Sequence, residues 1–192
     1  MKNLVMKIIA LSLLLSVLSF SIAYSSENPT SINKSNYKQL KEKLKGIDGK
    51  TAMAIANKWH MDKIDVVTFV TPDKVNFKFK DGETISIPLP DDIMIVSIAP
   101  YINKTHTCAT HYMSSCDAEL KNTNIKVVAV TAASGKILIN KTMKTAPTGF
   151  LDLWLPRNQT IDITVSAKGK SATGKIFTNR DSKTCETTLK LK

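Results

Sequence analysis

The sequence predicts an α+β protein: an N-terminal helical hairpin with a small antiparallel sheet, followed by an all-β antiparallel sandwich that carries a Cys/His loop. Two observations predict this. Apolar residues repeat with helical spacing to about residue 60, and then with the period of two that is typical of strands. From residue 93 onward, short strand patterns alternate with turn residues and no helical pattern follows. We expect an α+β domain at residues 26–92 and a sandwich domain at residues 93–192.

Residues 1–25 predict a cleaved signal peptide. Lys2 and Lys7 form a positive start, a long apolar run follows, and the small residues Ala23 and Ser25 suit signal peptidase. The apolar run of about 15 residues is shorter than the roughly 20 that span a bilayer. We therefore expect export and cleavage, with no membrane association of the mature chain.

The first domain combines two helices with three strands. Tyr37, Leu40 and Leu44 have helical spacing, and so does the group Ala52, Ile55, Ala56 and Trp59. Period-two alternation then predicts strands near residues 65–71, 75–79 and 85–89, with a hairpin turn at Asp81-Gly82. The helices need a partner for their apolar faces, and this sheet supplies one.

The second domain contains only strand patterns. Turn residues at 134–135, 156–158 and 169 separate these patterns, which is typical of an antiparallel sandwich. The predicted strands cover residues 93–99, 125–132, 136–140, 150–155, 161–167, 172–178 and 184–191.

Residues 100–124 do not fit a sandwich, which would use a short connection there. This polar stretch has no periodicity, and structureless loops of such length are usually functional or disordered. It holds two of the three cysteines, Cys108 and Cys116, together with His106, His111 and Met113. Thiolate, thioether and imidazole groups are soft or borderline donors, so the cluster favours Cu(I) over hard cations. We predict a copper-binding loop here.

The third cysteine, Cys185, lies near the start of the last predicted strand. It shares one parity with Thr187, Leu189 and Leu191, so all four should point inward. An inward side chain at that end of the sandwich could meet Cys108 and Cys116. Three thiolates suffice for Cu(I); His106, His111 and Met113 would then be further ligands, ligands on the access path, or groups that orient the ligands.

Several alternatives remain open at this stage. Cys108 and Cys116 could form a plain disulfide while Cys185 is a buried apolar residue. Zn(II) could replace copper in a Cys₃His site, although the Cys-x₇-Cys spacing lacks the short knuckle of structural zinc sites. A thiol–disulfide redox partner is another class, weakened by the lack of a Cys-x-x-Cys motif. No grouping of residues typical of a hydrolase stands out, so we do not expect an enzyme.

The charge of the chain does not indicate nucleic-acid binding. Removal of Lys2 and Lys7 lowers the formal net charge from +11 to +9. The lysines are scattered, and Arg157 and Arg180 are the only arginines. Nucleic-acid binding proteins usually add arginine forks and aromatic platforms. We expect these lysines to form solvated faces.

The string from Thr105 to Cys116, together with Cys185 on the last strand, resembles the CueP family of periplasmic copper-binding proteins. The order of predicted elements resembles that family along the whole mature chain. The resemblance implies a copper-resistance protein of the bacterial envelope whose copper-site residues are Cys108, Cys116 and Cys185, assisted by nearby histidines. It also implies a homodimer that supplies cuproenzymes such as a copper/zinc superoxide dismutase.

Redox chemistry accompanies the binding prediction. Three thiols in an oxidising compartment can become one disulfide and one thiol, so exchange with a thiol oxidoreductase would control metal loading. The same thiols could reduce Cu(II) to Cu(I) as they pair, an accessory activity that we expect beside copper binding.

Overall fold

The structure is a computed structural model that describes residues 34–192. The predicted signal peptide, residues 1–25, lies outside the described residues. Within residues 34–192, no helix combines the length and the apolar character needed to cross a bilayer.

Two helices open the described chain, α1 (Lys34–Glu42) and α2 (Gly49–Met61). The carboxylate of Asp48 accepts a hydrogen bond from the backbone N–H of Thr51 at 2.7 Å. This N-cap satisfies a donor that the first turn of α2 leaves unpaired. The predicted helical hairpin is therefore confirmed, and α2 turns an apolar face inward. The buried residues of α2 are Gly49, Ala52, Met53, Ala56 and Trp59.

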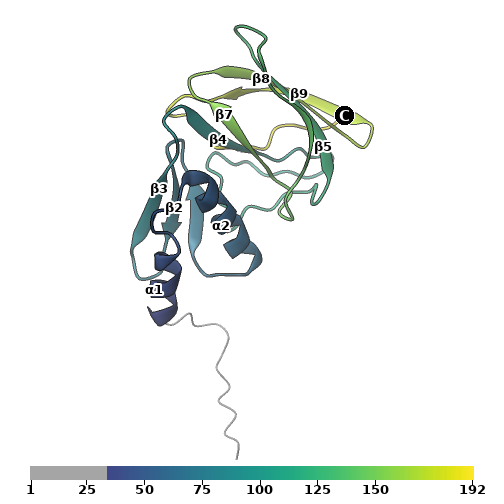
Figure 1. Cartoon of the computed structure of the whole chain (residues 1–192). Coiled ribbons are helices and arrows are strands. Elements are labelled where there is room, and N and C mark those ends of the chain that lie inside the picture. The colour runs from purple at the N-terminus through teal and green to yellow at the C-terminus, as the bar shows by residue number, and fades with distance from the viewer. Residues whose placement is uncertain (1–33) are drawn as a thin grey trace, which may run out of the picture. The chain divides into compact units, whose positions relative to one another are not determined.

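Three antiparallel strands follow, β1 (Val67–Val70), β2 (Lys74–Lys78) and β3 (Thr84–Pro88), in the order β1-β2-β3. Gly82 has a φ of 91° in the predicted turn between β2 and β3, a conformation that glycine adopts at no steric cost. The helices pack against this sheet (Figure 1). Trp59 of α2 meets Phe77 of β2 edge to face, with 5.2 Å between the ring centroids.

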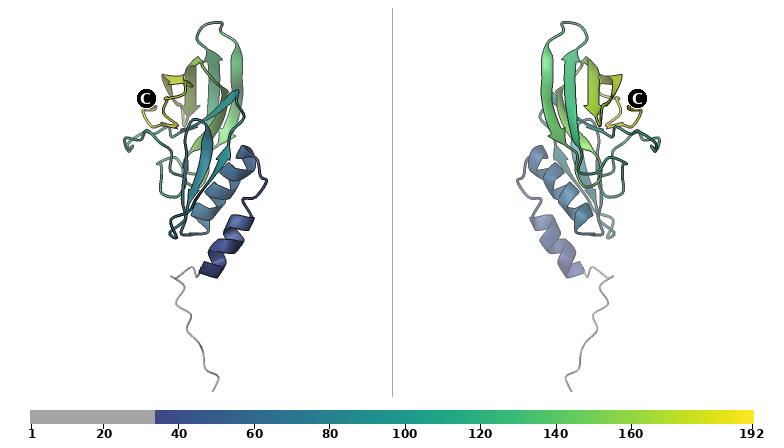
Figure 2. Two further views of the ribbon diagram at one scale, coloured as in Figure 1. Left: turned by 90° about the vertical axis from the view of Figure 1, so that its left-hand side faces the viewer. Right: turned by 90° about the vertical axis from the view of Figure 1, so that its right-hand side faces the viewer.

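The rest of the chain forms a sandwich of two sheets, seen edge-on in Figure 2. One sheet has the order β10-β4-β7 and the other β6-β5-β8-β9. The first contains β4 (Ile93–Ile98), β7 (Leu151–Pro156) and β10 (Cys185–Glu186). The second contains β5 (Asn124–Thr131), β6 (Ile137–Lys144), β8 (Thr160–Ala167) and β9 (Lys170–Phe177).

The last strand is shorter than predicted, and it runs parallel to its neighbour rather than antiparallel. Regular pairing is limited to β10, which is parallel to β4 with Cys185 opposite Ser97. After β9 the chain crosses to the other sheet and passes β4 in the same direction, so this pair is parallel while the other paired strands of the sandwich are antiparallel. The predicted inward alternation is confirmed. Its four members, Cys185, Thr187, Leu189 and Leu191, are all buried.

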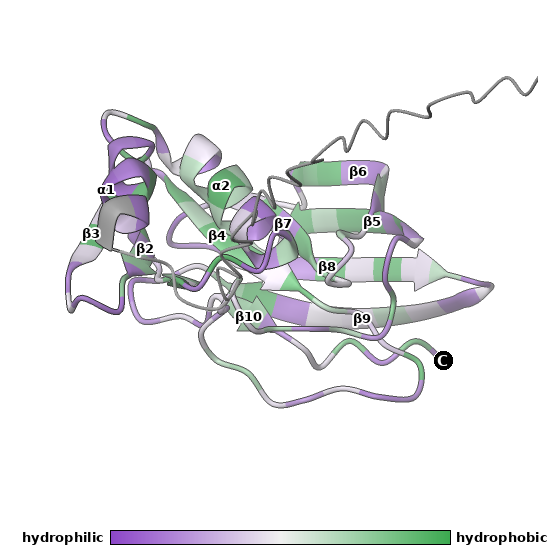
Figure 3. Ribbon diagram, turned by 90° about the horizontal axis from the view of Figure 1, so that it is seen from below, coloured by the Kyte–Doolittle hydropathy of each residue, from purple (hydrophilic) through white to green (hydrophobic). Residues whose placement is uncertain are grey.

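Two hydrophobic cores share β4. Ile95 belongs to one core, whereas its neighbours Met94 and Val96 belong to the other, because successive side chains of a strand point to opposite faces. Hydrophobic residues follow β4 and β5 in Figure 3. The helix core comprises Tyr37, Leu40, Leu44, Ala52, Met53, Ala56, Trp59, Val66, Val70, Val75, Phe77, Phe79, Ile87, Leu89, Ile95 and Met113. The sandwich core comprises Met94, Val96, Ile98, Leu120, Ile125, Val127, Ala129, Leu151, Leu153, Leu155, Ile161, Ile163, Val165, Ala167, Ile176, Leu189 and Leu191.

Residues 99–123, here called the cysteine loop, connect β4 to β5 without a helix or a strand, as predicted. The loop runs along the free edge of β1, where the N–H of Val70 donates to the carbonyl of His111 at 3.0 Å. A carboxylate oxygen of Glu119 accepts backbone N–H bonds from Ile102, Asn103 and Lys104 at 2.8, 2.9 and 3.1 Å. The loop is therefore long, but its middle is bonded to β1 and Glu119 joins its first residues to its last part.

Candidate metal centre

Two cysteines of the cysteine loop lie side by side. The Sγ atoms of Cys108 and Cys116 are 3.9 Å apart. Cys116 ends a single helical turn in which its N–H donates to the carbonyl of Tyr112 at 2.8 Å. A ring nitrogen of His106 joins the two sulfurs, and the three ligand atoms lie within 4.8 Å of one another. Soft and borderline donors therefore converge at one point of the loop.

Cys185 reaches the same point from β10. It is 1% exposed and forms a small apolar cluster with Ala99 and Phe150, against which Cys108 and Cys116 pack. Its sulfur lies within hydrogen-bonding reach of both loop sulfurs. All three cysteines are free thiols. The structure therefore brings together the three sulfurs that the sequence analysis grouped.

The three sulfurs differ in their affinity for protons. The hydrogen bond from Cys185, followed by that from His111, holds the pKa of Cys116 well below its usual range. The hydrogen bond to Cys116 and burial raise the pKa of Cys185. Burial also raises the pKa of Cys108. Cys116 is thus the thiolate of the group, whereas Cys185 and Cys108 keep their protons.

The two histidines of the loop have different surroundings. His106 is exposed, and its ring lies 6.4 Å from that of Phe150. His111 is 2% exposed, and its ring lies 4.4 Å from the same phenyl group. The buried Nδ1 of His111 has no hydrogen-bond partner among residues 34–192. Such an unsatisfied nitrogen is costly, and it lies on the ring that contacts Cys116.

Met113 lies elsewhere. Its side chain is 1% exposed and belongs to the helix core, whereas the cysteines surround Ala99 and Phe150. Along this stretch His111 and Met113 are buried while Tyr112 between them is exposed. The thioether therefore fills an apolar core, a common use of methionine, and we do not include Met113 in the proposed ligand set.

Two residues that the sequence analysis did not identify hold the cysteine loop in place. Nδ1 of His60, in the last turn of α2, lies 2.8 Å from the carbonyl oxygen of Ser114. The hydroxyl of Thr184 lies between the loop and β1. Neither has a motif, because each acts only through hydrogen bonds to backbone groups that are distant in the sequence. Only the position of Thr184 next to Cys185 hints at its role.

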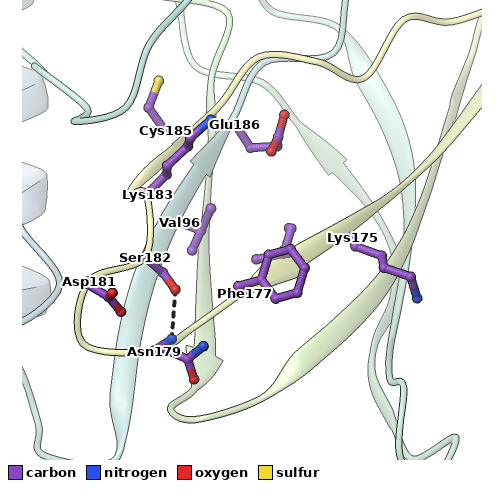
Figure 4. A pocket seen from close by; sticks show the side chains of 10 residues that line it. Val96, Lys175, Phe177, Asn179, Asp181, Ser182, Lys183, Cys185 and Glu186 are labelled. Carbon is purple, nitrogen blue, oxygen red and sulfur yellow. Dashed lines mark hydrogen bonds between the residues drawn. The ribbon is translucent and has the colours of Figure 1, made fainter.

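A cavity gives access to the sulfurs. It has a volume of about 170 Å³, and its lining includes His106, Cys108 and Cys185. A separate hollow of about 420 Å³ lies between β9 and β10. There the sulfur of Cys185 points away from Phe177 and Lys175 (Figure 4). The reactive atom of Cys185 therefore faces the loop, and the hollow is a different surface.

The donor set suits a soft cation. Three sulfurs satisfy the two or three ligands that Cu(I) takes, and thiolates release their protons readily when a metal arrives. An imidazole as fourth donor would complete the tetrahedron that Zn(II) prefers. The arrangement is thus chemically able to bind either ion, with Cu(I) favoured by the excess of sulfur.

Comparison with known proteins agrees with this chemistry. Residues 53–190 match the sequence model of the family described as "Periplasmic copper-binding protein CueP". A solved structure named "Crystal Structure of S.CueP" has a TM-score of 0.74 and 26% sequence identity, over 84% of this chain and 99% of that one. A comparison with curated protein sequences finds no match.

Proposed function

Because this chain belongs to the CueP family of periplasmic copper-binding proteins, we propose that it holds one Cu(I) ion between the sulfurs of Cys108, Cys116 and Cys185. One observation carries the proposal. The buried thiol of Cys185 in β10 packs against the thiols of Cys108 and Cys116, although the cysteine loop is far from β10 in the sequence. Structural burial alone would not require three free thiols at one point, since a disulfide or apolar residues fill such a space at lower cost.

The roles of the residues follow from their surroundings. Cys116 is ionised already, so it binds the arriving ion first. Cys185 then loses its proton, because a soft cation displaces protons from thiols. His106, exposed at the access cavity, receives the ion from solvent. His111 supports the Cys116 thiolate and offers its unsatisfied Nδ1 as an additional donor.

We propose copper tolerance as the biological role. An exported protein that sequesters Cu(I) lowers the concentration of free copper in the envelope. It would also act as a chaperone that passes copper to a cuproenzyme such as copper/zinc superoxide dismutase, and it would act as a homodimer. A thiol oxidoreductase would keep the three cysteines reduced, because a disulfide between any two removes the sulfur site.

An anaerobic Cu(I) titration against a competing chelator tests the site. We expect tight binding of one ion and a loss of about tenfold or more in affinity for each cysteine-to-serine variant, since each removes one of three ligands. Met113→Leu is the control, because that side chain lies in the helix core. If Cys185→Ser binds Cu(I) as tightly as the wild type, the three-sulfur site is wrong.

The accessory reaction has a separate test. One thiol and one thiolate can pass one electron each to two Cu(II) ions, which gives two Cu(I) ions, one disulfide and one released proton. The 3.9 Å between the sulfurs of Cys108 and Cys116 supports their pairing. Protein incubated anaerobically with Cu(II) should lose two thiols as Cu(I) appears. Unchanged thiol content would contradict this activity.

Zinc binding is the second candidate, since His106, whose ring nitrogen lies with the sulfurs of Cys108 and Cys116, could complete a Cys₃His tetrahedron. The same competition experiment with Zn(II) separates the two. Tight Zn(II) binding with weak Cu(I) binding would favour a secreted structural metal site. If neither ion binds tightly while a disulfide forms readily, a thiol–disulfide redox partner would be the better description.

A further inference from the structure

Thr184 lies where three separate segments meet. Its side chain is 1% exposed. The hydroxyl donates to the carbonyl of Val70 at 2.7 Å and accepts the N–H of His111 at 3.0 Å. One hydroxyl therefore satisfies a backbone group at the end of β1 and another in the middle of the cysteine loop.

The backbone of Thr184 is bonded on both sides as well. Its N–H donates to the carbonyl of Ala109 at 2.9 Å, and the N–H of Cys185 reaches the same carbonyl at 3.2 Å. Its own carbonyl accepts the N–H of Ser97 in β4 at 2.9 Å. Thr184 is thus tied to the segment between Cys108 and His111, and also to the sheet that carries Cys185.

We propose that Thr184 is a positioning residue of the Cu(I) site, holding the cysteine loop in register with Cys185. The inference rests on the proposed function, because it concerns the geometry of the same three sulfurs. Cys108 and Cys185 come from different elements, and no covalent link joins them. The bonds of Thr184, together with the N–H of Cys185, join residues 109–111 directly to the segment that carries Cys185. Groups that orient metal ligands typically matter by 10- to 100-fold in affinity.

Loss of the hydroxyl leaves two buried backbone groups without a partner. The N–H of His111 and the carbonyl of Val70 would then move to find water or another partner, because buried unpaired groups are costly. Movement of His111 also moves the ring beside Cys116. The distances among the sulfurs would widen, even though Thr184 itself touches no metal.

The chain offers a matched control. The hydroxyl of Thr178, which is 0% exposed, donates to the carbonyl of Pro156 at 2.7 Å and accepts the N–H of Gln159 at 3.0 Å. The burial and these two bonds match those of Thr184, although the Thr178 hydroxyl also lies 3.3 Å from the carbonyl of Gln159, and the partners lie outside the cysteine loop. Thr178→Val therefore reports the general cost of removing such a hydroxyl.

The experiment compares Thr184→Val, Thr184→Ser and Thr178→Val in the reduced, full mature protein. Cu(I) affinity is measured by competition with a chelator, and the near-ultraviolet absorption of the Cu(I)–thiolate group is recorded. We expect Thr184→Val to lose about tenfold or more in affinity and to change this spectrum. Thr184→Ser keeps the hydroxyl, so it should restore both properties. Thr178→Val should bind Cu(I) as the wild type does, although both valine variants lose stability.

Wild-type affinity in Thr184→Val, or an equal loss in Thr178→Val, would overturn the positioning role alone. Weak Cu(I) binding by the wild type itself would overturn the proposed function together with this inference. If Thr184→Val does not fold, Thr184→Ala with Thr178→Ala as its control gives the same comparison.

Discussion

Cys116 is the most acidic cysteine of the candidate metal centre because two neighbours stabilise its thiolate. The thiol of Cys185 and the ring of His111 both hydrogen-bond to its sulfur and lower its pKa. Cys108 and Cys185 have raised pKa values in the same cluster. A group of three identical side chains therefore contains one nucleophile and two proton-bearing thiols.

This difference predicts selective alkylation of the reduced, metal-free protein. Iodoacetamide attacks thiolates, so a lowered pKa keeps Cys116 reactive down to about pH 5, where ordinary thiols are protonated. Cys108 and Cys185 should react only at alkaline pH. Peptide mass spectrometry across a pH series measures the three rates. His111→Gln should move the Cys116 profile to higher pH, and equal rates for all three cysteines at pH 6 would contradict the assignment.

Glu119 predicts a pH dependence of stability. Burial alone would raise its pKa, but the backbone N–H groups of Asn103, Lys104 and Ile102 lower the pKa to about 2. The folded-state pKa is below the unfolded-state value of about 4.3. The stabilisation is therefore complete above pH 5 or so and is lost as the pH falls towards 2.

Glu119→Gln tests this point by urea unfolding. We expect the free energy of unfolding to fall by about 1 kcal/mol at pH 7, because three N–H groups lose a charged acceptor. The difference from the wild type should shrink as the pH approaches 2. Glu42→Gln is the control, since its carboxylate pairs with exposed Lys45 at 2.7 Å and such pairs contribute little. A difference that is constant with pH would refute the explanation.

At the scale of elements, the connection between β6 and β7 supports the cysteine loop from outside. Gly149 in this connection has a φ of 87°, and a Cβ there would lie 2.7 Å from the carbonyl oxygen of Ala118. Ala118 follows Cys116 by two residues and packs on the cysteine cluster. Glycine is thus needed both for the backbone conformation and for the close approach.

Two glycine variants separate these requirements. Gly135→Ala, with a φ of 65° and open space around its Cβ, should cost about 1 kcal/mol from backbone strain alone. Gly149→Ala adds a steric clash with the loop, so we expect a loss of about 3 kcal/mol. Thermal and urea unfolding measure both. Equal losses in the free energy of unfolding would show that Ala118 moves away from the added Cβ without an energetic cost.

At the scale of the whole molecule, β4 couples the two cores. Ile95 fills the helix core while Met94 and Val96 fill the sandwich core. If β4 is displaced from one core, it is therefore displaced from the other core as well. The sequence predicts separate domains at residues 26–92 and 93–192, and the behaviour of β4 on unfolding decides whether they are independent.

We predict one cooperative unfolding transition for the part of the chain that the structure describes. Ile95→Ala should lower the free energy of unfolding by about 3 kcal/mol, as for other buried isoleucines. Both tryptophans, Trp59 and Trp154, contact the helix core, so their fluorescence reports that core. Far-ultraviolet circular dichroism reports the sheets, and the two midpoints should shift together. Separate midpoints would instead favour independent domains.

Much of this fold and site was predictable from the order of residue types. The spacing of Ala52, Ala56 and Trp59 predicted the buried face of α2, because a helix repeats every 3.6 residues. Alternation predicted that Cys185 points inward, since strand side chains alternate between faces. The unusual length of the cysteine loop indicated a functional segment. Each of these signals is local, so neighbouring residues suffice to read it.

The sequence by itself determined the elements, the loop and the soft donors, because periodicity and side-chain chemistry act over a few residues. Only the tertiary structure decided which donors meet. Met113 lies within the string of candidate ligands yet fills the helix core, while Cys185 comes from the end of the chain to the sulfurs of the loop. The parallel pairing of β10 with β4 and the hydroxyl of Thr184 bring about that meeting. Both depend on contacts between residues far apart in the chain, which no local pattern encodes.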